Sequence, residues 1–470
     1  MSEDLPEGWA RTTLARVCSH RSGSSKRIKG KLHAGAGPGR YQGFSASGPD
    51  VWSDTWDHEG EAIVVSAVGA RCGRAFKARG RWSATTNTYV VWPRLEAVEL
   101  DYLFLYLDNE GFWAKGGSAQ PFVKVRETFE RPLALPPRPE QRRIVAKVEA
   151  LLAEVNASRA RLARASLLLR RLRRAVLAAA CSGRLTEDWR ASGGAAAADG
   201  LAEGLPGSPR GAVHEGGAAS GDPAPRLPAS WTVRPFGALV DNHDGRRVPV
   251  RAADRERRRG PYPYYGASGI IDTIDGYLFD GDYLLVAEDG ANLLSRSTAV
   301  AFSASGRFWV NNHAHVVQPK AGVVLGYLEG FLNGLDLQHH VTGSAQPKLT
   351  QAALNAIPVP LPPPEEQAEI VRRAQAVFAL AGPIEERVAA AAARAEKLPQ
   401  VILARALSGQ LVPTEAELAR AEGRDYEPAE ELLRRIPGGR LKPGAKQTGD
   451  AAAEEAAGSA AGRRRARESA

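Results

Sequence analysis

Two stretches of the chain carry apolar residues at alternating steps of four and three positions, within residues 136–186 and 361–412. This spacing is typical of the heptad repeat, in which the apolar positions form a seam along one side of an α-helix. The predicted seam residues are Ile144, Val148, Leu151, Val155, Leu162, Leu169, Leu172 and Val176 in the first helix, and Ile370, Val377, Ile384, Val388, Leu398 and Ile402 in the second. Gly382, Pro383 and Pro399 interrupt the second seam, and we expect them to kink or break that helix.

A helix with an apolar seam is not stable alone in water, so each of these helices needs a partner. The two seams share one register, and we therefore expect the helices to pair as an intramolecular coiled coil. The alternative is that each helix packs on the globular part of its own half of the chain.

Short motifs occur twice along the chain, in the same order. They are L-P-x-x-W at Leu5–Trp9 and Leu227–Trp231, G-S-A-Q-P at Gly117–Pro121 and Gly343–Pro347, L-P-P-x-x-E-Q at Leu135–Gln141 and Leu361–Gln367, and S-G-x-L at Ser182–Leu185 and Ser408–Leu411. Four motifs repeated in one order indicate a tandem duplication. Each copy contains a globular part followed by a long helix.

The globular parts combine strand and helix patterns, which predicts an α+β fold. Short apolar runs bounded by turn-forming residues predict strands at Ala62–Ser66, Tyr89–Trp92, Tyr283–Val286 and His315–Val317. Helices are expected at Leu100–Phe112 and Leu325–Leu335. The predicted segments are globular domain 1 (1–135), helix 1 (136–186), a flexible linker rich in Ala, Gly and Pro (187–226), globular domain 2 (227–360), helix 2 (361–412), a short helical extension (413–436) and a disordered tail (437–470).

The composition fits a soluble globular protein with more than one domain. The chain has 470 residues, of which 43% are hydrophobic and 24% are charged. No apolar run reaches the roughly 18 residues that cross a bilayer, and the N-terminal sequence lacks a secretory signal pattern. We therefore expect no membrane association and a cytoplasmic location. Cys18, Cys72 and Cys181 lie far apart, which predicts reduced thiols and not a disulfide framework.

Basic clusters point to nucleic acid more clearly than the net charge of +9 does. One cluster lies between Arg21 and Lys31, and the other follows Arg246 and is succeeded by an aromatic stretch. Arginine and lysine can contact phosphates or base edges, although a single solvated basic loop would look the same. The candidate DNA-binding residues are Arg21, Lys26, Arg27, Lys29, Lys31, Arg71, Arg74, Gln120 and Lys124 in the first copy, and Arg246, Arg247, Arg251, Tyr262, Tyr264, Tyr265, Gln346 and Lys348 in the second.

The first long helix carries a further basic stretch. From Val155 to Thr186 there are eight arginines and no acidic residue. This face could track a phosphate backbone or bind an acidic partner, and the sequence does not choose between them.

We find no pattern that predicts catalysis. The phosphate-binding G-x-x-x-x-G-K-[ST] motif, a glycine-rich dinucleotide turn and the Asn-Pro-Pro-aromatic motif of base methylation are all missing. His313 and His315 have the spacing of two residues on one face of a strand, and we interpret them as part of an ordinary polar strand and not as metal ligands. Glu59 and Glu61 are interpreted as a solvated turn. The sequence therefore predicts no catalytic residues, metal or cofactor.

Taken together, the motifs make the chain similar to the specificity subunits of type I restriction-modification enzymes. The duplicated L-P-x-x-W, G-S-x-Q-P and L-P-P-x-x-E-Q motifs carry this resemblance over about Leu5 to Ile436. Tyr262–Ile271, Glu288–Gly290 and Ser66–Gly73 resemble parts of the target-recognition domains of that family.

The resemblance implies a non-catalytic reader of double-stranded DNA. Each target-recognition domain would read one half of a bipartite site. The two helices would pair antiparallel, set the spacer between the half-sites and bind two methylation subunits, through which restriction subunits join. S-adenosylmethionine, ATP and Mg²⁺ would belong to those partners. Two alternatives are a self-contained DNA modification enzyme with diverged motifs and a coiled-coil scaffold that binds only proteins.

Overall fold

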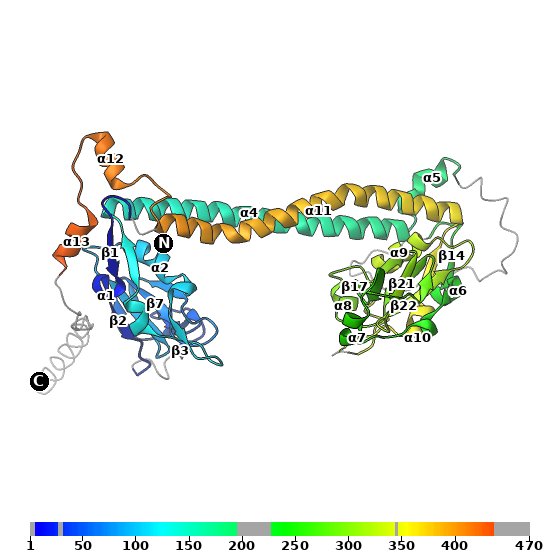
Figure 1. Cartoon of the computed structure of the whole chain (residues 1–470), viewed down its shortest axis with the longest axis horizontal. Coiled ribbons are helices and arrows are strands. Elements are labelled where there is room, and N and C mark those ends of the chain that lie inside the picture. Colours follow the sequence, from blue (N-terminus) through cyan, green and yellow to red (C-terminus); the bar gives the residue numbers. More distant parts are fainter. Residues whose placement is uncertain (1–4, 27–31, 195–226, 344–345, 437–470) are drawn as a thin grey trace, which may run out of the picture. The chain divides into compact units, whose positions relative to one another are not determined.

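The computed structural model describes residues 5–26, 32–194, 227–343 and 346–436 (Figure 1). The chain divides by its internal contacts into two units. Unit 1 consists of Met1–Ala160 and Ala393–Ala470, and unit 2 consists of Arg161–Ala392. Each unit therefore contains one globular part and a portion of both long helices. The predicted linker beyond residue 194 and the predicted tail from 437 lie outside the described residues.

The globular part of unit 1 contains a four-stranded and a five-stranded sheet, in the orders β2-β10-β7-β8 and β3-β5-β4-β9-β6. Its elements are β1 (Ala10–Thr13), α1 (Leu14–Val17), β2 (Cys18–Ser22), β3 (Leu32–His33), β4 (Tyr41–Ser45), β5 (Gly48–Ser53), β6 (His58–Glu59), β7 (Ala62–Ser66), β8 (Ala75–Ala78), β9 (Arg81–Ala84), β10 (Thr88–Pro93), α2 (Leu100–Leu107), the 3₁₀ helix η1 (Glu110–Phe112), β11 (Lys115–Gly116), β12 (Phe122–Val123), α3 (Val125–Phe129) and β13 (Pro132–Leu135). Two-stranded pairs β1-β13 and β11-β12 complete it.

Unit 2 repeats this plan with the sheet orders β15-β22-β19-β20 and β17-β16-β21-β18 and the pair β14-β23. Its elements are β14 (Thr232–Pro235), α6 (Phe236–Leu239), β15 (Val240–Asn242), η3 (Asp244–Arg246), α7 (Ala252–Arg257), β16 (Tyr262–Gly266), β17 (Gly269–Ile274), β18 (Phe279–Asp280), β19 (Tyr283–Ala287), α8 (Asn292–Ser295), β20 (Ala301–Ala304), β21 (Arg307–Val310), β22 (Ala314–Pro319), α9 (Leu325–Gly334), α10 (Gln351–Ala356) and β23 (Pro358–Leu361). In both units one parallel contact, β4 with β9 and β16 with β21, lies within an otherwise antiparallel sheet.

Every residue of the central strands β7 and β19 is buried, because both faces of each strand are covered. In β7, Ile63 and Val65 pack in the core that contains α2, whereas Ala62 and Val64 pack against Trp82 of the second sheet. This period of two is the alternation of a strand placed between two apolar layers. The strand predictions at Ala62–Ser66 and Tyr283–Val286 are confirmed. The predicted helix from Leu100 ends at Leu107, and residues 110–112 form a separate 3₁₀ turn.

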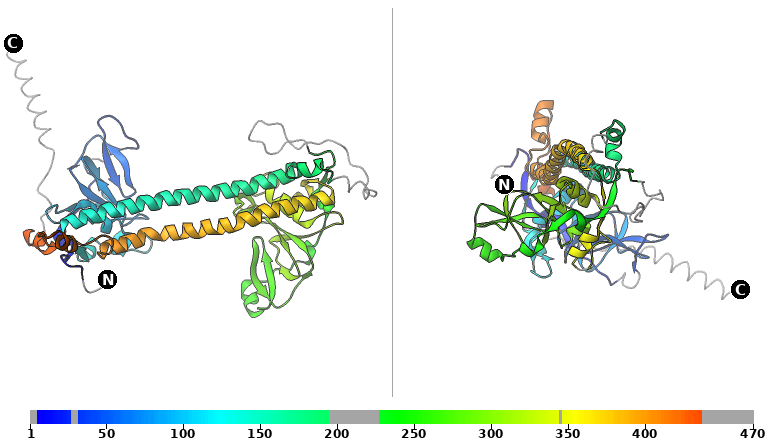
Figure 2. Two further views of the ribbon diagram at one scale, coloured as in Figure 1. Left: turned by 90° about the horizontal axis from the view of Figure 1, so that it is seen from above. Right: turned by 90° about the vertical axis from the view of Figure 1, so that its right-hand side faces the viewer.

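The two long helices are α4 (Arg138–Cys181) and α11 (Pro364–Leu407), and they pack together in both units (Figure 2). In unit 1, Arg159 of α4 forms an ion pair with Glu396 at 3.0 Å. In unit 2, Arg173 forms two hydrogen bonds of 2.7 Å with Glu385. The residue numbers rise along α4 while those of the partners fall along α11, so the helices are antiparallel. The predicted helix pairing is confirmed.

Each helix also packs on the globular part that precedes it. Ile144 and Val148 of α4 lie in the core of unit 1, together with Ile402 and Ala406 of α11. Ile370 of α11 and Ala180 of α4 lie in the core of unit 2. The alternative of packing on the preceding domain therefore holds at the first turns of each helix, beside the coiled coil.

Most predicted seam residues are buried or half-buried, but three are not. Leu172, Ile384 and Leu398 are 42%, 50% and 43% exposed, so their prediction as seam residues is wrong. In unit 2 the contact is made one residue further along each helix, by Arg173 and Glu385. A straight α-helix repeats every 3.6 residues and drifts by about 20° per heptad relative to a strict 3.5-residue repeat, which moves the contact to the neighbouring position.

The expectation that proline breaks the second helix is wrong, since α11 runs without interruption through Pro383 and Pro399. A proline inside a helix leaves the carbonyl four residues earlier without its amide donor. For Pro399 that carbonyl belongs to Ala395, and it accepts a hydrogen bond of 3.2 Å from Nε of Arg159. The partner helix thus supplies the missing donor.

A buried glutamate at the start of each long helix joins three distant segments. In unit 1, Glu140 accepts hydrogen bonds of 2.8 Å from the Trp9 indole and from the backbone amide of Glu415, which follows α11. In unit 2, Glu366 accepts from the Trp231 indole at 2.9 Å and from the Thr186 hydroxyl at 2.7 Å, which follows α4. We call each set a helix-entry clasp. Each clasp holds the segment that follows the other long helix.

The segments that follow the helices differ in length. After α4, residues within the predicted linker form the short helix α5 (Glu187–Ala191). After α11, α12 (Glu415–Glu422) and α13 (Ala429–Arg435) form, and Leu432 and Leu433 of α13 are buried in the core of unit 1. No helix among the described residues is long and apolar enough to cross a membrane.

The clasp in unit 1 predicts a large effect of Glu140→Ala on stability. This change leaves two buried donors, the Trp9 indole and the Glu415 amide, without an acceptor. We expect the free energy of unfolding to fall by about 1–3 kcal/mol for each donor left unpaired, measured by urea unfolding of the full chain. Glu154→Ala, at an exposed position of the same helix, is the control and should change stability by less than about 0.5 kcal/mol. Equal stability of the two variants would contradict the role of the clasp.

Candidate nucleic-acid interface

The loops at one edge of the central sheet of unit 1 are joined by hydrogen bonds between backbone atoms. The Ala67 amide donates to the Asn87 carbonyl, and the Gly69 amide donates to the Pro121 carbonyl, both at 2.9 Å. The Val123 amide donates to the Ala67 carbonyl at 2.9 Å. The loop after β7 is therefore held between the loop that precedes β10 and the G-S-A-Q-P loop.

Unit 2 contains the same set of backbone hydrogen bonds. The Glu288 amide donates to the His313 carbonyl at 2.9 Å, the Gly290 amide to the Pro347 carbonyl at 3.0 Å, and the Leu349 amide to the Glu288 carbonyl at 2.8 Å. Gly290 has φ 107° and its counterpart Gly69 has φ 95°, a backbone region that favours glycine. We call these loops, with the hairpin tips beside them, the loop frame of each unit.

The tip of the hairpin formed by β4 and β5 joins the loop frame of unit 1. In unit 1, the Ser66 hydroxyl donates to the Ala46 carbonyl at 2.7 Å, and the Arg71 guanidinium donates to the Ser47 carbonyl. A backbone bond at the end of the parallel strand pair is present in both units: the Thr85 amide donates to the Phe44 carbonyl at 2.9 Å, and the Asn311 amide donates to the Tyr265 carbonyl at 3.1 Å. Backbone geometry is thus repeated between the units, while the exposed side chains on it differ.

The structure brings several of the predicted residues of the first copy to this edge of unit 1. Those with exposed side chains near the loop frame are Arg21, Lys26, Arg71, Arg74 and Gln120. Arg21 lies at the end of β2 and not in a loop, because β2 pairs with β10 as far as Ser22. Lys124 is at the start of α3, where its ammonium pairs with Glu127 at 2.9 Å. Arg27, Lys29 and Lys31 lie outside the described residues.

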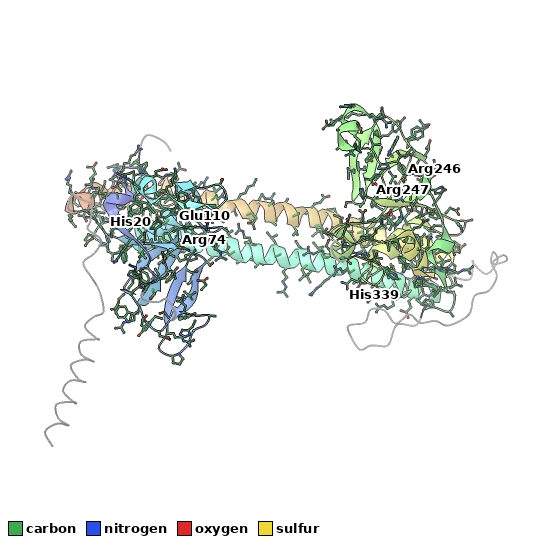
Figure 3. All side chains as sticks on the ribbon, turned by 90° about the horizontal axis from the view of Figure 1, so that it is seen from below. His20, Arg74, Glu110, Arg246, Arg247 and His339 are labelled. Carbon is green, nitrogen blue, oxygen red and sulfur yellow. The ribbon has the colours of Figure 1, made fainter. Side chains whose placement is uncertain are left out.

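The basic stretch of the second copy contains exposed and enclosed residues, and Figure 3 labels Arg246 and Arg247 from it. Arg246 stacks on Phe279 and donates a hydrogen bond to the Leu278 carbonyl. Arg246 and Arg251 are exposed, as are Gln346 and Lys348. Arg247 is enclosed, with its guanidinium 2.6 Å from Glu288 and 2.8 Å from the Ala314 carbonyl. Arg247 thus has a structural role beneath the loop frame, and its contact with DNA stays a prediction.

Two of the three predicted tyrosines belong to the interior. Tyr264 is 1% exposed, and its hydroxyl accepts a hydrogen bond of 3.0 Å from the Val250 amide, so it is enclosed in this structure. Burial raises the pKa of Tyr265, whose ring packs on Phe302 and Phe308. Tyr262 is half-buried beside Tyr277. Tyr264 and Tyr265 are consecutive and point to opposite faces of β16, and each face is covered, by Ile274 and Trp309 around Tyr264 and by Phe302 and Phe308 around Tyr265.

A network of buried charges lies beneath the loop frame of unit 2. Nδ1 of His315 is 2.6 Å from Asp244, and Nε2 is 2.9 Å from the Leu349 carbonyl. Glu288 lies between Arg247 at 2.6 Å and the Lys348 ammonium at 3.1 Å. Of these five side chains only that of Lys348 is exposed, at 51%. The network thus fixes the position of one cationic group at the surface.

The pKa values of both carboxylates in this network are lowered. Burial alone would raise the pKa of Asp244, but hydrogen bonds from His315 and the Val316 amide hold it below its ordinary value. Burial would likewise raise the pKa of Glu288, but the hydrogen bonds from Arg247 and Lys348 outweigh burial and hold the pKa below its ordinary value. Both groups are therefore held as carboxylates by their cationic neighbours.

The spacing of His313 and His315 predicted that both rings lie on one face of a strand. The structure shows that they do not. Strand β22 begins at Ala314, so His313 lies in the preceding turn, where it contacts Asp289 at 2.8 Å. His315 is buried and contacts Asp244. Among the described residues, no group of three or more metal-binding side chains is present. The Asp289 partner could not be found from sequence, because it comes from a distant loop.

The basic stretch of α4 has two acidic partners on α11. Arg159 pairs with Glu396 and Arg173 with Glu385. The remaining arginines with exposed side chains are Arg161, Arg164, Arg170, Arg171, Arg174 and Arg184. The alternative of an acidic partner is thus realised within the chain for Arg159 and Arg173. Glu59 and Glu61, interpreted as a solvated turn, form surface ion pairs with Arg81 and Arg79.

The chain is similar in sequence to proteins of known class. The family model described as "Type I restriction modification DNA specificity domain" matches residues 228–389. The EcoDI specificity subunit of Escherichia coli is 28% identical and aligns over 94% of this chain and 98% of its own length. A Haemophilus influenzae protein, also named as a type I restriction enzyme specificity subunit, is 36% identical over 31% of this chain, and the chain spans only 37% of its length.

A solved structure described as showing complex assembly and conformational transition of the type I R-M system has the same fold. It is 18% identical, with a TM-score of 0.60, and the alignment covers 87% of this chain and 100% of that one. The two structures share two α+β domains and paired long helices. The chain is thus similar to type I restriction enzyme specificity subunits, along most of its length to the EcoDI subunit and over residues 228–389 to the family model.

The buried charge network predicts an acid-sensitive contribution to the stability of unit 2. The lowered pKa values of Asp244 and Glu288 mean that their contribution is present above the unfolded values, near pH 4, and is lost as the pH falls through the folded values. Asp244→Ala should lower the free energy of unfolding by about 3–5 kcal/mol at neutral pH, because it leaves buried cationic groups unpaired. Urea unfolding between about pH 7 and 3 should show this difference shrinking below about pH 4.

The control for this series is Asp241→Ala. Its side chain is 63% exposed and is 3.8 Å from Lys320. An exposed pair of this kind contributes about 0–1 kcal/mol. A difference between Asp244→Ala and the unchanged chain that stays constant down to about pH 3 would contradict the role of the network.

Proposed function

We propose that this chain is the DNA-recognition subunit of a type I restriction-modification complex, with each unit reading one half of a bipartite site. The observation that carries the proposal is the loop frame, which has the same backbone hydrogen bonds in both units but different exposed side chains. A constant backbone with variable side chains suits two modules that bind the same kind of duplex and read different bases.

The exposed cations on the loop frames suit contact with duplex DNA. In unit 1 these are Arg21, Lys26, Arg71 and Arg74, and in unit 2 Lys348. Arg246 and Arg251 are exposed elsewhere in unit 2, with Arg246 stacked on Phe279 and Arg251 at the start of α7. Arginine and lysine contact phosphates or the acceptors of guanine, and amides such as Gln120 and Gln346 can pair with adenine. The proposed segments are the two target-recognition domains (1–135 and 227–360) and the two helices (136–186 and 361–412).

The helix pair would bind the methylation subunits. Besides the internally paired arginines, it exposes large apolar side chains: Leu167, Leu168 and Leu172 on α4, and Leu380, Ile384, Leu398 and Val401 on α11. Exposed apolar side chains that recur along two packed helices favour a protein partner. We infer two methylation subunits, one for each copy of the duplication, with restriction subunits joining through them.

The chemistry would then reside in those partners. S-adenosylmethionine, ATP and Mg²⁺ would be bound by the methylation and restriction subunits, and this chain would contribute recognition without catalysis. Its relatives are named specificity subunits. Work on cellular and incoming DNA would place the complex in the cytoplasm.

The proposal predicts a bipartite footprint whose affinity falls steeply with salt. The full chain, alone and with its methylation subunits, should protect two blocks of a duplex that carries the site found by mapping methylated bases. Each neutralised phosphate releases condensed counterions, so each contact adds roughly one unit to the slope of log affinity against log salt. Lys26→Ala and Arg74→Ala should each lower that slope by about one and weaken protection of one block only.

Arg79→Ala is the control for these variants. Arg79 follows β8, whereas Arg74 precedes it, and its side chain pairs with Glu61 at 3.2 Å. The control should leave the slope and both blocks unchanged. One uninterrupted block, or affinity insensitive to salt, would refute the proposal, and methyl transfer by the chain alone would favour a self-contained enzyme.

The paired helices would also set the spacer between the half-sites. Both α4 and α11 contribute residues to unit 1 and to unit 2. One added heptad in each helix keeps the seam and adds about 10 Å, which corresponds to about three base pairs. Methylation mapped with the extended variant, expressed together with its methylation subunit, should show a longer spacer between unchanged half-sites. An unchanged spacer in an active variant would exclude this role.

A further inference from the structure

His313 and Asp289 form a pair on the surface of the unit 2 loop frame. Nδ1 of His313 is 2.8 Å and 3.0 Å from the two carboxylate oxygens of Asp289. The histidine side chain is 48% exposed and that of the aspartate is 18% exposed. The backbone of His313 is fixed on both sides, because its amide donates to the Asn311 side chain at 2.8 Å and its carbonyl accepts from the Glu288 amide. The ring is therefore held in one place at the surface.

The pair has no counterpart in unit 1. The shared backbone hydrogen bonds place Asn87 at the position of His313. The bridge of Val68 with Phe122, matched by that of Asp289 with Lys348, places Val68 at the position of Asp289. The duplication has thus kept the loop and exchanged a neutral amide for an ionisable ring with its own acceptor.

Stability alone does not account for an exposed pair of this kind, since such pairs contribute about 0–1 kcal/mol. The buried pair of His315 and Asp244 contrasts with it, because the ring of His315 uses both nitrogens inside the protein. Among the residues that the structure describes, Nε2 of His313 has no hydrogen-bonding partner. Asp289 orients the ring and leaves Nε2 available.

We propose that His313, positioned by Asp289, is a DNA-contacting residue of unit 2, and this proposal rests on the proposed function. With Nδ1 donating to Asp289, Nε2 accepts a hydrogen bond when the ring is neutral and donates one when it is protonated. DNA phosphates attract positive charge, so the protonated ring in the complex donates to an acceptor of the duplex, either guanine N7 or O6 or a phosphate oxygen.

The charged groups around His313 do not replace it in this role. Glu288 is held by Arg247 and Lys348, and the Lys348 ammonium is directed to Glu288 at 3.1 Å. Asp244 and His315 are bonded to each other inside the unit. His313 is thus the imidazole on this part of the frame that faces the surface with one ring nitrogen unbonded among the described residues.

The test measures affinity of the full chain for a duplex with the mapped bipartite site, at constant salt, between about pH 5.5 and 8. Affinity should weaken about tenfold as the pH rises through this range, the effect of losing one good hydrogen-bonded contact. His313→Asn, which copies Asn87, should bind weakly at both ends of the range. His313→Lys should bind tightly at both ends, because lysine stays charged. His315 is retained in both variants.

A second duplex, with the unit 2 half-site replaced, identifies the acceptor. If the pH dependence disappears on this duplex, His313 contacts a base edge, and if it remains, His313 contacts a phosphate. Both results support the proposal. His339→Asn is the control, since His339 is exposed in the same unit and lies away from Arg246 and Arg247 (Figure 3). It should leave the pH dependence unchanged.

The proposal is overturned if His313→Asn keeps the affinity and the pH dependence of the unchanged chain, with the thermal unfolding of the variants also unchanged. That result would leave the proposed function intact. Failure of the unchanged chain to prefer the bipartite duplex over a scrambled one would instead overturn the proposed function.

Discussion

The buried carboxylates of Glu140 and Glu366 are the interactions on which the arrangement of both units depends. A carboxylate removed from water must have its oxygens hydrogen-bonded. Burial raises the pKa of Glu140 above its ordinary value, although the Glu415 amide, the Trp9 indole and Arg143 each act to lower it. One oxygen takes the indole of the L-P-x-x-W motif, and the other takes a donor from the segment beyond the opposite long helix. Each unit can therefore complete its clasp only with residues from both copies of the duplication. This requirement explains why the L-P-x-x-W, L-P-P-x-x-E-Q and S-G-x-L motifs are repeated together.

The loop frames show how one backbone can carry two recognition surfaces. The hydrogen bonds that join the loops use only amides and carbonyls, with glycine where φ is positive, so side chains can change without moving the loops. In unit 1, two positions beneath the loop frame are occupied by the uncharged residues Ala67 and Tyr89. In unit 2 the corresponding residues Glu288 and His315 belong to a charge network. Each charge in that network has an opposite partner, which keeps the burial tolerable and holds Lys348 in place.

Much of the fold could be predicted from the sequence, because its signals are local or repeated. The apolar runs at Ala62–Ser66 and Tyr283–Val286 became strands, and the heptads became two paired helices. Failures occurred where a distant residue decides the outcome. Pro399 does not break α11, since Arg159 of the other helix bonds the carbonyl that the proline leaves free. The pairing of His313 with Asp289 is equally invisible, because the two residues meet only when β19 and β22 pair. The burial of Tyr264 was missed for a local reason, since its basic and aromatic neighbours hid the strand alternation that turns it inward.

Counting basic residues overstates the surface that a polyanion can contact. In the stretch that follows Arg246, Arg255 bonds Asp272 and stacks on Tyr264, and Arg258 bonds Asp275 and stacks on Trp309. These arginines hold α7 and the preceding loop on the sheet. Their positive charge is largely neutralised by the neighbouring carboxylates of Asp272 and Asp275. The remaining cations gain from this arrangement, because a side chain on a fixed loop loses less conformational freedom when it binds than one on a mobile loop. Internally paired arginines thus contribute to recognition indirectly, by positioning the few exposed groups that reach the duplex.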